Sequence, residues 1–101
     1  MKIYIPHSTS FDYKTELYAP VRSSAPNFRH EIVLPHEGAI NPVDTREAIR
    51  GADLIIAEVS YPSTGMGIEL GWADMMGKPV VAIYKTGCAP SAAVGIVTDA
   101  L

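Results

Sequence analysis

The sequence predicts an α/β fold, a flavodoxin or Rossmann-like three-layer sandwich with a parallel sheet of four or five strands. Short apolar segments rich in β-branched residues alternate along the chain with longer segments typical of helices. Pro, Gly or Ser follows each apolar segment, as is common where strands end. The 101 residues are 48% hydrophobic and 19% charged, so we expect one domain over residues 1–101.

The first half of the chain contains two expected strands with a helix between them. The apolar segments at residues 2–6 and 30–34 predict the strands. Residues 12–22 are expected to form the helix, in which Pro20 predicts a kink or an early end. Proline has this effect because it lacks an amide hydrogen and its ring clashes with the preceding turn.

The second half continues the alternation. The segments "DLIIAEV" and "KPVVAIY" are continuously apolar, which is typical of central strands covered by helices on both faces. Such alternation implies parallel strands joined by crossover connections. We expect a helix at residues 43–50, a strand at 53–59, a helix at 67–76, a strand at 79–84 and a short helix from residue 91.

The net charge and the single cysteine disfavour several classes of protein. A net charge of −3 disfavours a protein that holds long nucleic acid, because neutralising many phosphates requires a basic face. A single phosphate is still possible, since backbone amides at a helix start bind one without net positive charge. The lone Cys88 excludes an intramolecular disulfide and offers no metal-ligand spacing. We expect a cytoplasmic protein, with neither a signal peptide nor a membrane span readable from the sequence.

Candidate site residues follow from the expected topology, because open parallel sheets bind ligands beyond the carboxyl ends of their strands. The residues that follow the four expected strands are His7 and Ser8, then His36 and Glu37, then residues 58–67, and finally residues 85–91.

The segment "AEVSYPSTGMGIELG", residues 57–71, contains more candidate site residues than any other part of the chain. Ser63, Gly65 and Gly67 lead into the expected helix, where exposed amides and the helix dipole favour a phosphate or another anion. The same residues also fit a helix N-cap with glycines for a tight turn, and both interpretations stay open. Glu69, one turn into the helix, is favoured there by the dipole in any case. The dipole also keeps a carboxylate ionised, as a nucleophile requires, and the glycines leave space in front of it.

The segment "GMGIELG" is also a relative of the glycine fingerprint of dinucleotide-binding proteins. That fingerprint follows the first strand and is paired with an acid about 20 residues further on. Here the glycines follow the third expected strand, and the later segment reads "YKTG". A nicotinamide-dependent enzyme is therefore disfavoured.

Residues 52–85, "ADLIIAEVSYPSTGMGIELGWADMMGKPVVAIYK", resemble the central segment of the nucleoside 2-deoxyribosyltransferase superfamily. Within it, the resemblance is closest to the 2'-deoxynucleoside 5'-monophosphate N-glycosidases. It implies that Glu69 is the nucleophile that attacks the anomeric carbon of the sugar, and that Tyr4 lies close to that sugar. It also implies that Ser63, Gly65 and Gly67 contact the 5'-phosphate. Ser91 resembles a serine that reaches the phosphate site of a neighbouring subunit, which implies a homodimer or higher homo-oligomer.

At two places the sequence departs from the family pattern, and Glu58, at the end of the third expected strand, also has two possible roles. Asp44 is one residue out of register with a family aspartate, and it is either the proton donor to the leaving base or the cap of the following helix. His7 and Ser8 stand where many relatives have Gly-Ser, which alters the sugar pocket and makes Ser8 a candidate substrate contact. Glu58 either orients the site or bonds neighbouring loop amides. Relatives also continue with another strand and helix, whereas this sequence stops at Leu101.

The resemblance therefore implies cleavage of the N-glycosidic bond of 2'-deoxynucleosides or their 5'-monophosphates, by hydrolysis or by transfer to a second base. Such a reaction requires a carboxylate on the sugar face and a proton donor for the base. It implies no metal and no cofactor. The alternative is a non-catalytic nucleotide-binding module of the same fold.

Overall fold

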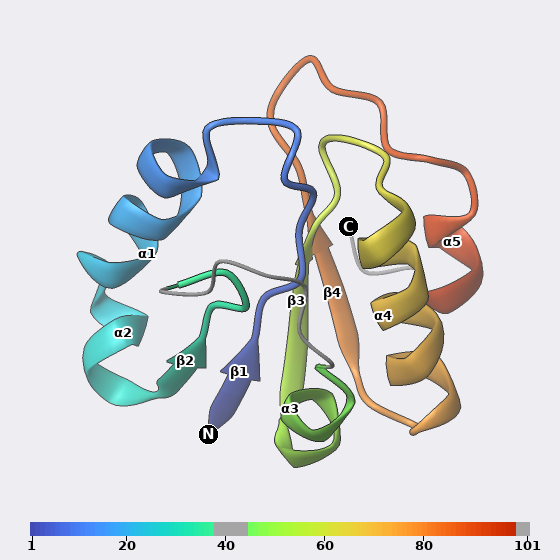
Figure 1. Cartoon of the computed structure of the whole chain (residues 1–101). Helices are drawn as coiled ribbons and strands as arrows, with labels where there is room; N and C mark the ends of the chain where they lie inside the picture. Colours follow the sequence, from blue (N-terminus) through green and yellow to red (C-terminus); the bar gives the residue numbers. More distant parts are fainter. Residues whose placement is uncertain (38–44, 99–101) are drawn as a thin grey trace.

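The computed structural model describes residues 1–37 and 45–98. Within them, four parallel strands form one sheet in the order β2-β1-β3-β4, with helices on both faces (Figure 1). The strands are β1 (Lys2–Tyr4), β2 (Glu31–Val33), β3 (Leu54–Glu58) and β4 (Val80–Ile83). The predicted fold class is confirmed, since this is the layered α/β arrangement expected from alternating strands and helices.

Strand β1 lies at the centre of the sheet, between β2 and β3. Tyr4 is paired with Val33 on one side and with Ile55 on the other. An isolated parallel bridge between His7 and Glu58 continues the pairing beyond β1. Residues that follow β1, β2 and β3 therefore emerge together at the carboxyl edge of the sheet.

One face of the sheet is covered by α3 (Arg46–Gly51), α4 (Thr64–Met75) and α5 (Val94–Val97). Its core includes Ile49, Ile55, Leu70 and Val94, and the ring of Tyr4, whose side chain is 0% exposed. Removing this apolar surface from water is the main contribution to the stability of the sandwich.

The opposite face is covered by a π-helical segment, η1 (Lys14–Tyr18), followed by α1 (Ala19–Arg22). Leu17 and Tyr18 pack there against Ile3, Ile5 and Ile32. The early end predicted as one effect of Pro20 does not occur, since the helix continues past Pro20 to Arg22 after the π-helical segment. A short helix, α2 (Ala25–Arg29), was not predicted.

Helix α4 begins at Thr64, earlier than the predicted residue 67. The side chain of Ser63 accepts a hydrogen bond from the Met66 amide at 3.3 Å, and this N-cap allows the helix to include both glycines. Gly65 and Gly67 therefore lie inside the helix, and Glu69 is its sixth residue rather than a first-turn residue.

Strand β4 is an edge strand, so the prediction that it is covered on both faces is wrong. Val80 and Ala82 are buried under the α4 face, but Val81 and Ile83 are 36% and 42% exposed. The helices of the second face cover β2 and β1 and do not extend over β4 (Figure 1). Across the described ranges, no helix is long and apolar enough to cross a membrane.

Candidate active site

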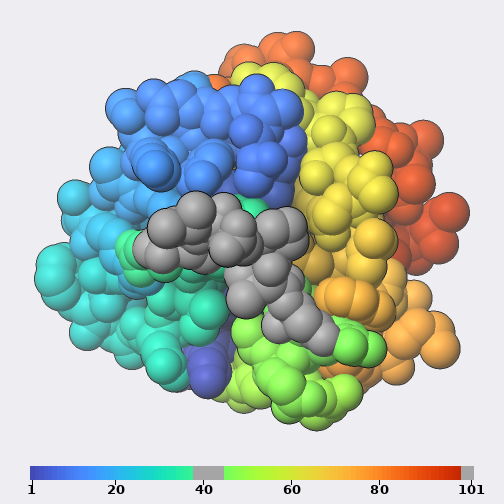
Figure 2. Space-filling view, in the orientation of Figure 1, coloured from blue at the N-terminus to red at the C-terminus, as the bar shows by residue number. Residues whose placement is uncertain are grey.

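A hollow of about 250 Å³ opens at the carboxyl edge of the sheet, and Glu69 is one of its walls. We call it the Glu69 hollow. The chain after β1 and the start of α4 approach each other on this face of the molecule (Figure 2). Its lining residues are His7, Thr9, Pro35, His36, Thr45, Ser63, Gly65, Met66 and Glu69.

The Glu69 carboxylate accepts two hydrogen bonds, and both end on the same oxygen. The phenol of Tyr4 and the hydroxyl of Thr45, the latter at 3.2 Å, donate to Oε2. Within residues 1–37 and 45–98, Oε1 accepts no hydrogen bond. Helix α4 thus presents to the hollow a carboxylate with one oxygen held and the other available.

Burial raises the pKa of the Glu69 carboxyl above its ordinary value, because the charged form loses water. The hydrogen bonds from Tyr4 and Thr45 and the charge of His36 act in the opposite direction. The net shift differs from the expectation that the helix dipole would dominate, since Glu69 lies too far from the first turn.

Tyr4 connects the buried core with the hollow. Its ring is fully buried on the α4 face of β1, and only its phenol oxygen reaches Glu69. Burial, followed by the hydrogen bond to Glu69, raises the pKa of the Tyr4 phenol. The hydroxyl therefore stays protonated and acts as a donor to the carboxylate.

Thr45 was missed by the sequence analysis. It occupies the N-cap position of α3, yet its side chain makes no cap hydrogen bond and donates to Glu69 instead. The neighbouring Asp44 was predicted as proton donor or cap, and it lies outside the described residues. The only indication in the sequence was that the Thr45 hydroxyl directly follows Asp44, a candidate catalytic residue.

The start of α4 forms the floor of the hollow. Ser63 and Gly65 line it, and the Ser63 hydroxyl caps the Met66 amide. In the described part of the chain, the amides of Thr64 and Gly65 have no acceptor. Of these two residues only Gly65 lines the hollow, and its amide at the positive end of a 12-residue helix can bind a phosphate oxygen.

The two histidines of the hollow differ in their hydrogen bonds. His7 is 3% exposed, and its Nδ1 contacts the Ser8 carbonyl oxygen at 2.7 Å while Nε2 contacts the Tyr18 hydroxyl at 2.6 Å. Because a carbonyl only accepts, Nδ1 carries the proton and Nε2 accepts from Tyr18. Burial lowers the pKa of His7, in keeping with a neutral ring. His36, in contrast, has no ring-nitrogen hydrogen bond to any residue that the structure describes.

Four predicted substrate contacts do not line the Glu69 hollow. The Ser8 hydroxyl is buried and bonded to Ser10 Oγ at 2.7 Å, in a local turn. Glu58 accepts a hydrogen bond from the Ser60 amide at 2.7 Å, which matches the loop-amide alternative. Gly67 and Ser91 line a second hollow, of about 450 Å³ and mostly apolar, between α4 and α5. We call this second space the α4–α5 hollow.

Helix geometry explains the separation of the two glycines. Residues 65 and 69 are four apart and lie on one side of α4, whereas residue 67 is rotated by about 200° from residue 65. Within residues 1–37 and 45–98, no group of three or more His, Cys, Asp or Glu side chains is placed to hold a metal ion.

Comparison with known proteins confirms the predicted resemblance. Over 54 residues, 54% of this chain, it is 44% identical to a protein of Syntrophotalea carbinolica named as a 2'-deoxynucleoside 5'-phosphate N-hydrolase. Over 37 residues, 37% of this chain, it is 46% identical to the 5-hydroxymethyl-dUMP N-hydrolase of Mus musculus. These matches cover only 37% and 21% of the relatives' own lengths. No protein-family model matches the chain.

Solved structures confirm the fold over the whole chain. A 2-deoxyribosyltransferase from Bacillus psychrosaccharolyticus superposes with a TM-score of 0.74 at 22% sequence identity. The superposition covers 100% of this chain and 82% of that structure. At this identity the likeness establishes the shared architecture, and the chemistry has to be argued from the site itself.

Proposed function

We propose that this protein cleaves the N-glycosidic bond of 2'-deoxynucleoside 5'-monophosphates, with Glu69 as the nucleophile. The supporting observation is a single hollow lined both by Glu69, whose Oε1 accepts no hydrogen bond from the described residues, and by Gly65, whose amide at the start of α4 has no acceptor among them. An anionic phosphate bound at this helix end would place the attached sugar beside the carboxylate. The relatives named as N-hydrolases of deoxynucleotides support the same substrate class.

The proposed reaction has two displacement steps. In the first, Oε1 of Glu69 forms a bond to C1' of the sugar while the bond from C1' to the base nitrogen breaks. The electron pair leaves with the base, which takes up one proton. In the second, the ester bond breaks when water, or the nitrogen of another base, attacks C1' and loses a proton. Water gives a hydrolase and a second base gives a transferase.

Tyr4 and Thr45 would hold the carboxylate during both steps. Their bonds to Oε2 restrict the rotation of the carboxyl group and leave Oε1 free of hydrogen bonds from the described residues. We retain Asp44 as the proposed proton donor to the base. His36 is proposed to contact the base, because its ring lines the hollow and its nitrogens are unengaged within the described residues.

We also propose that the protein acts in the cytoplasm as a homodimer or higher homo-oligomer. Ser91 lies in the α4–α5 hollow of its own chain, so a role in phosphate binding would require a neighbouring copy. The exposed Val81 and Ile83 are apolar surface that a partner could bury. Sedimentation analysis tests this proposal, and a strictly monomeric active protein would contradict it.

The central experiment is to incubate the purified protein with each deoxynucleoside and each deoxynucleoside 5'-monophosphate and to detect free base by chromatography. We expect release from the monophosphates, and adding a second base separates hydrolysis from transfer. Glu69→Gln should abolish release, whereas Glu47→Gln, at an exposed glutamate of α3, should not. Binding of nucleotides by wild type without release would overturn the catalytic proposal and support a binding module.

A further inference from the structure

The turn at residues 35–37 forms one wall of the Glu69 hollow. Pro35 and His36 line the hollow, and the turn is closed by the Glu37 amide, which donates to the Leu34 carbonyl at 3.2 Å. The turn follows directly after β2, which ends at Val33. Any displacement of this turn would move the His36 ring relative to Glu69.

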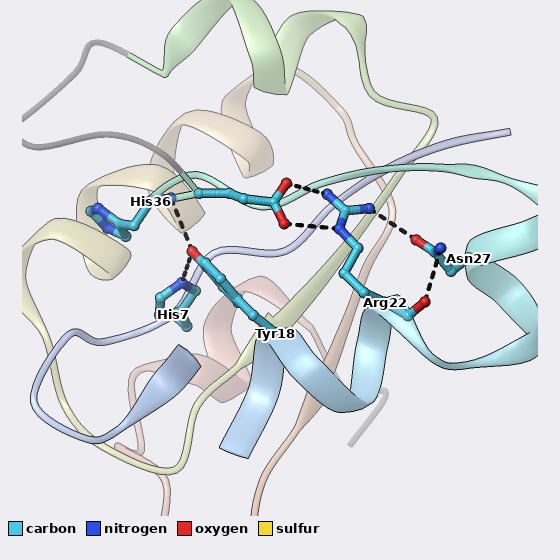
Figure 3. A network of polar contacts seen from close by, with 6 residues as sticks. His7, Tyr18, Arg22, Asn27 and His36 are labelled. Atoms are coloured by element: carbon cyan, nitrogen blue, oxygen red, sulfur yellow. Dashed lines mark hydrogen bonds and ion pairs between the residues drawn. The ribbon is translucent and has the colours of Figure 1, made fainter. Parts of the chain in front are cut away.

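Two side chains of one helix hold this turn from outside (Figure 3). Tyr18 closes η1 and Arg22 closes α1, four residues later, so both point the same way. The Tyr18 hydroxyl oxygen accepts a hydrogen bond from the His36 amide at 2.9 Å. Arg22 donates to both oxygens of the Glu37 carboxylate, from Nε at 3.0 Å and from Nη2 at 2.7 Å.

The Tyr18 hydroxyl also holds the opposite wall. Its proton is donated to Nε2 of His7 at 2.6 Å, while its oxygen accepts from the His36 amide. Tyr18 is 6% exposed, so losing this hydroxyl would leave two polar groups of the walls without a partner. One phenol therefore links the segment after β1 to the segment after β2.

The Arg22–Glu37 pair has little to contribute to stability. The two side chains are 34% and 50% exposed, and ion pairs in water contribute little to folding. Its geometry is nevertheless specific, because the planar guanidinium binds both carboxylate oxygens and its Nη1 donates to Asn27 Oδ1 at 2.9 Å. An ion pair that contributes little to stability but fixes the direction of both side chains is suited to positioning the turn.

We infer that Tyr18 and Arg22 are positioning residues that hold the 35–37 turn, so that His36 meets the leaving base while the sugar lies against Glu69. This inference rests on the proposed function. It predicts that disturbing the clamp impairs reaction of intact nucleotides without impairing capture of the sugar phosphate.

Tyr18→Phe and Glu37→Gln test the inference, with Glu47→Gln as the matched control. The control removes a charge from another exposed pair, Glu47 with Arg50 on α3, which does not touch the 35–37 turn. For each protein, kcat and KM are measured with the best deoxynucleoside monophosphate. The inhibition constant of 2-deoxyribose 5-phosphate, which has no base, is measured in parallel.

We expect Tyr18→Phe and Glu37→Gln to lower kcat/KM by about ten-fold, since small misplacements of reacting groups are costly. Inhibition by the base-free sugar phosphate should stay within about two-fold, and the control should match wild type in both respects. Arg22→Lys keeps the charge but loses the fork, so it should behave as Glu37→Gln does. The melting temperature of Glu37→Gln should stay within about 2 °C of wild type.

Three outcomes would overturn the inference. Wild-type kcat/KM in Glu37→Gln would show that the clamp is not needed, and this exposed variant carries the test if Tyr18→Phe fails to fold. Equal losses for nucleotide and base-free sugar phosphate would show a general structural effect. If wild type releases no base from any substrate, both the proposed function and this inference fail. If wild type releases base and the variants have the same kcat/KM as wild type, only the positioning role of Tyr18 and Arg22 is refuted.

Discussion

Replacing Tyr4 by Phe should destabilise the protein in a pH-dependent manner. The ring is 0% exposed in the core, and Phe keeps its volume, so the change removes only the hydroxyl that donates to Glu69. A hydrogen bond to a charged acceptor contributes about 1.5–3 kcal/mol, and one to a neutral acceptor about 0.5–1.5 kcal/mol. We therefore expect a loss of about 2 kcal/mol where Glu69 is ionised and about 1 kcal/mol where it is protonated.

The direction of this pH dependence follows from the linkage between proton binding and folding. The Tyr4 bond lowers the pKa of Glu69 against the larger effect of burial, so its removal raises that pKa further in the folded state. The cost of Tyr4→Phe should therefore grow as the pH rises through the folded-state pKa of Glu69, which burial raises above its ordinary value. At about 4–8 °C per kcal/mol, the melting temperature should fall by about 8–16 °C at pH 8.

Denaturation of wild type, Tyr4→Phe, Glu69→Gln and the double variant from pH 4 to pH 8 forms the assay. The double-mutant cycle isolates the coupling between the two side chains at each pH. With Gln at position 69, the cost of Tyr4→Phe should no longer change with pH. A cost that is the same at every pH in the wild-type background would refute the assignment of this bond to the ionised carboxylate.

Three further predictions concern α4. Burial raises the pKa of Glu69, so the stability that its carboxyl contributes is present below the ordinary pKa and is lost as the pH rises through the folded-state value. Glu69→Gln should therefore have a higher melting temperature than wild type at pH 8 and the same melting temperature at pH 4. Ser63→Ala removes the N-cap of α4 and should cost about 1 kcal/mol in urea denaturation, with a weaker preference for phosphorylated substrates. Gly65→Ala and Gly67→Ala should each stabilise the helix by about 0.5–1 kcal/mol, yet only Gly65→Ala, in the Glu69 hollow, should raise KM. Equal KM values for the two alanine variants would contradict the placement of the hollow.

The layered fold was predictable because each strand is bounded by Pro, Gly or Ser and each carries apolar residues in succession. The exposure of β4 was not, because "KPVVAIY" is equally apolar whether or not a helix covers it. Burial on the second face depends on where η1 and α1 lie across the sheet, and the local sequence does not contain that information.

The meeting of Glu69 with Ser63 and Gly65 was predictable from the strand-end rule and the helix that follows. The start of α4 was misplaced because two glycines lower helix propensity, while the Ser63 cap compensates. That error placed Gly67 beside Glu69, although helical periodicity puts it on the other side. The bond from Thr45 joins segments 24 residues apart, which no local pattern reveals.

The dual environment of Tyr4 has an evolutionary and practical consequence. Its ring packs in the core and its hydroxyl donates to Glu69, so we expect a core substitution that shifts the ring to shift that hydrogen bond as well. Variants selected for a higher melting temperature through substitutions in the core should therefore also change in kcat, even where no substituted residue contacts the substrate. Improving stability without changing the rate would have to rely on exposed positions far from the hollow, such as Phe28 of α2, which is 80% exposed.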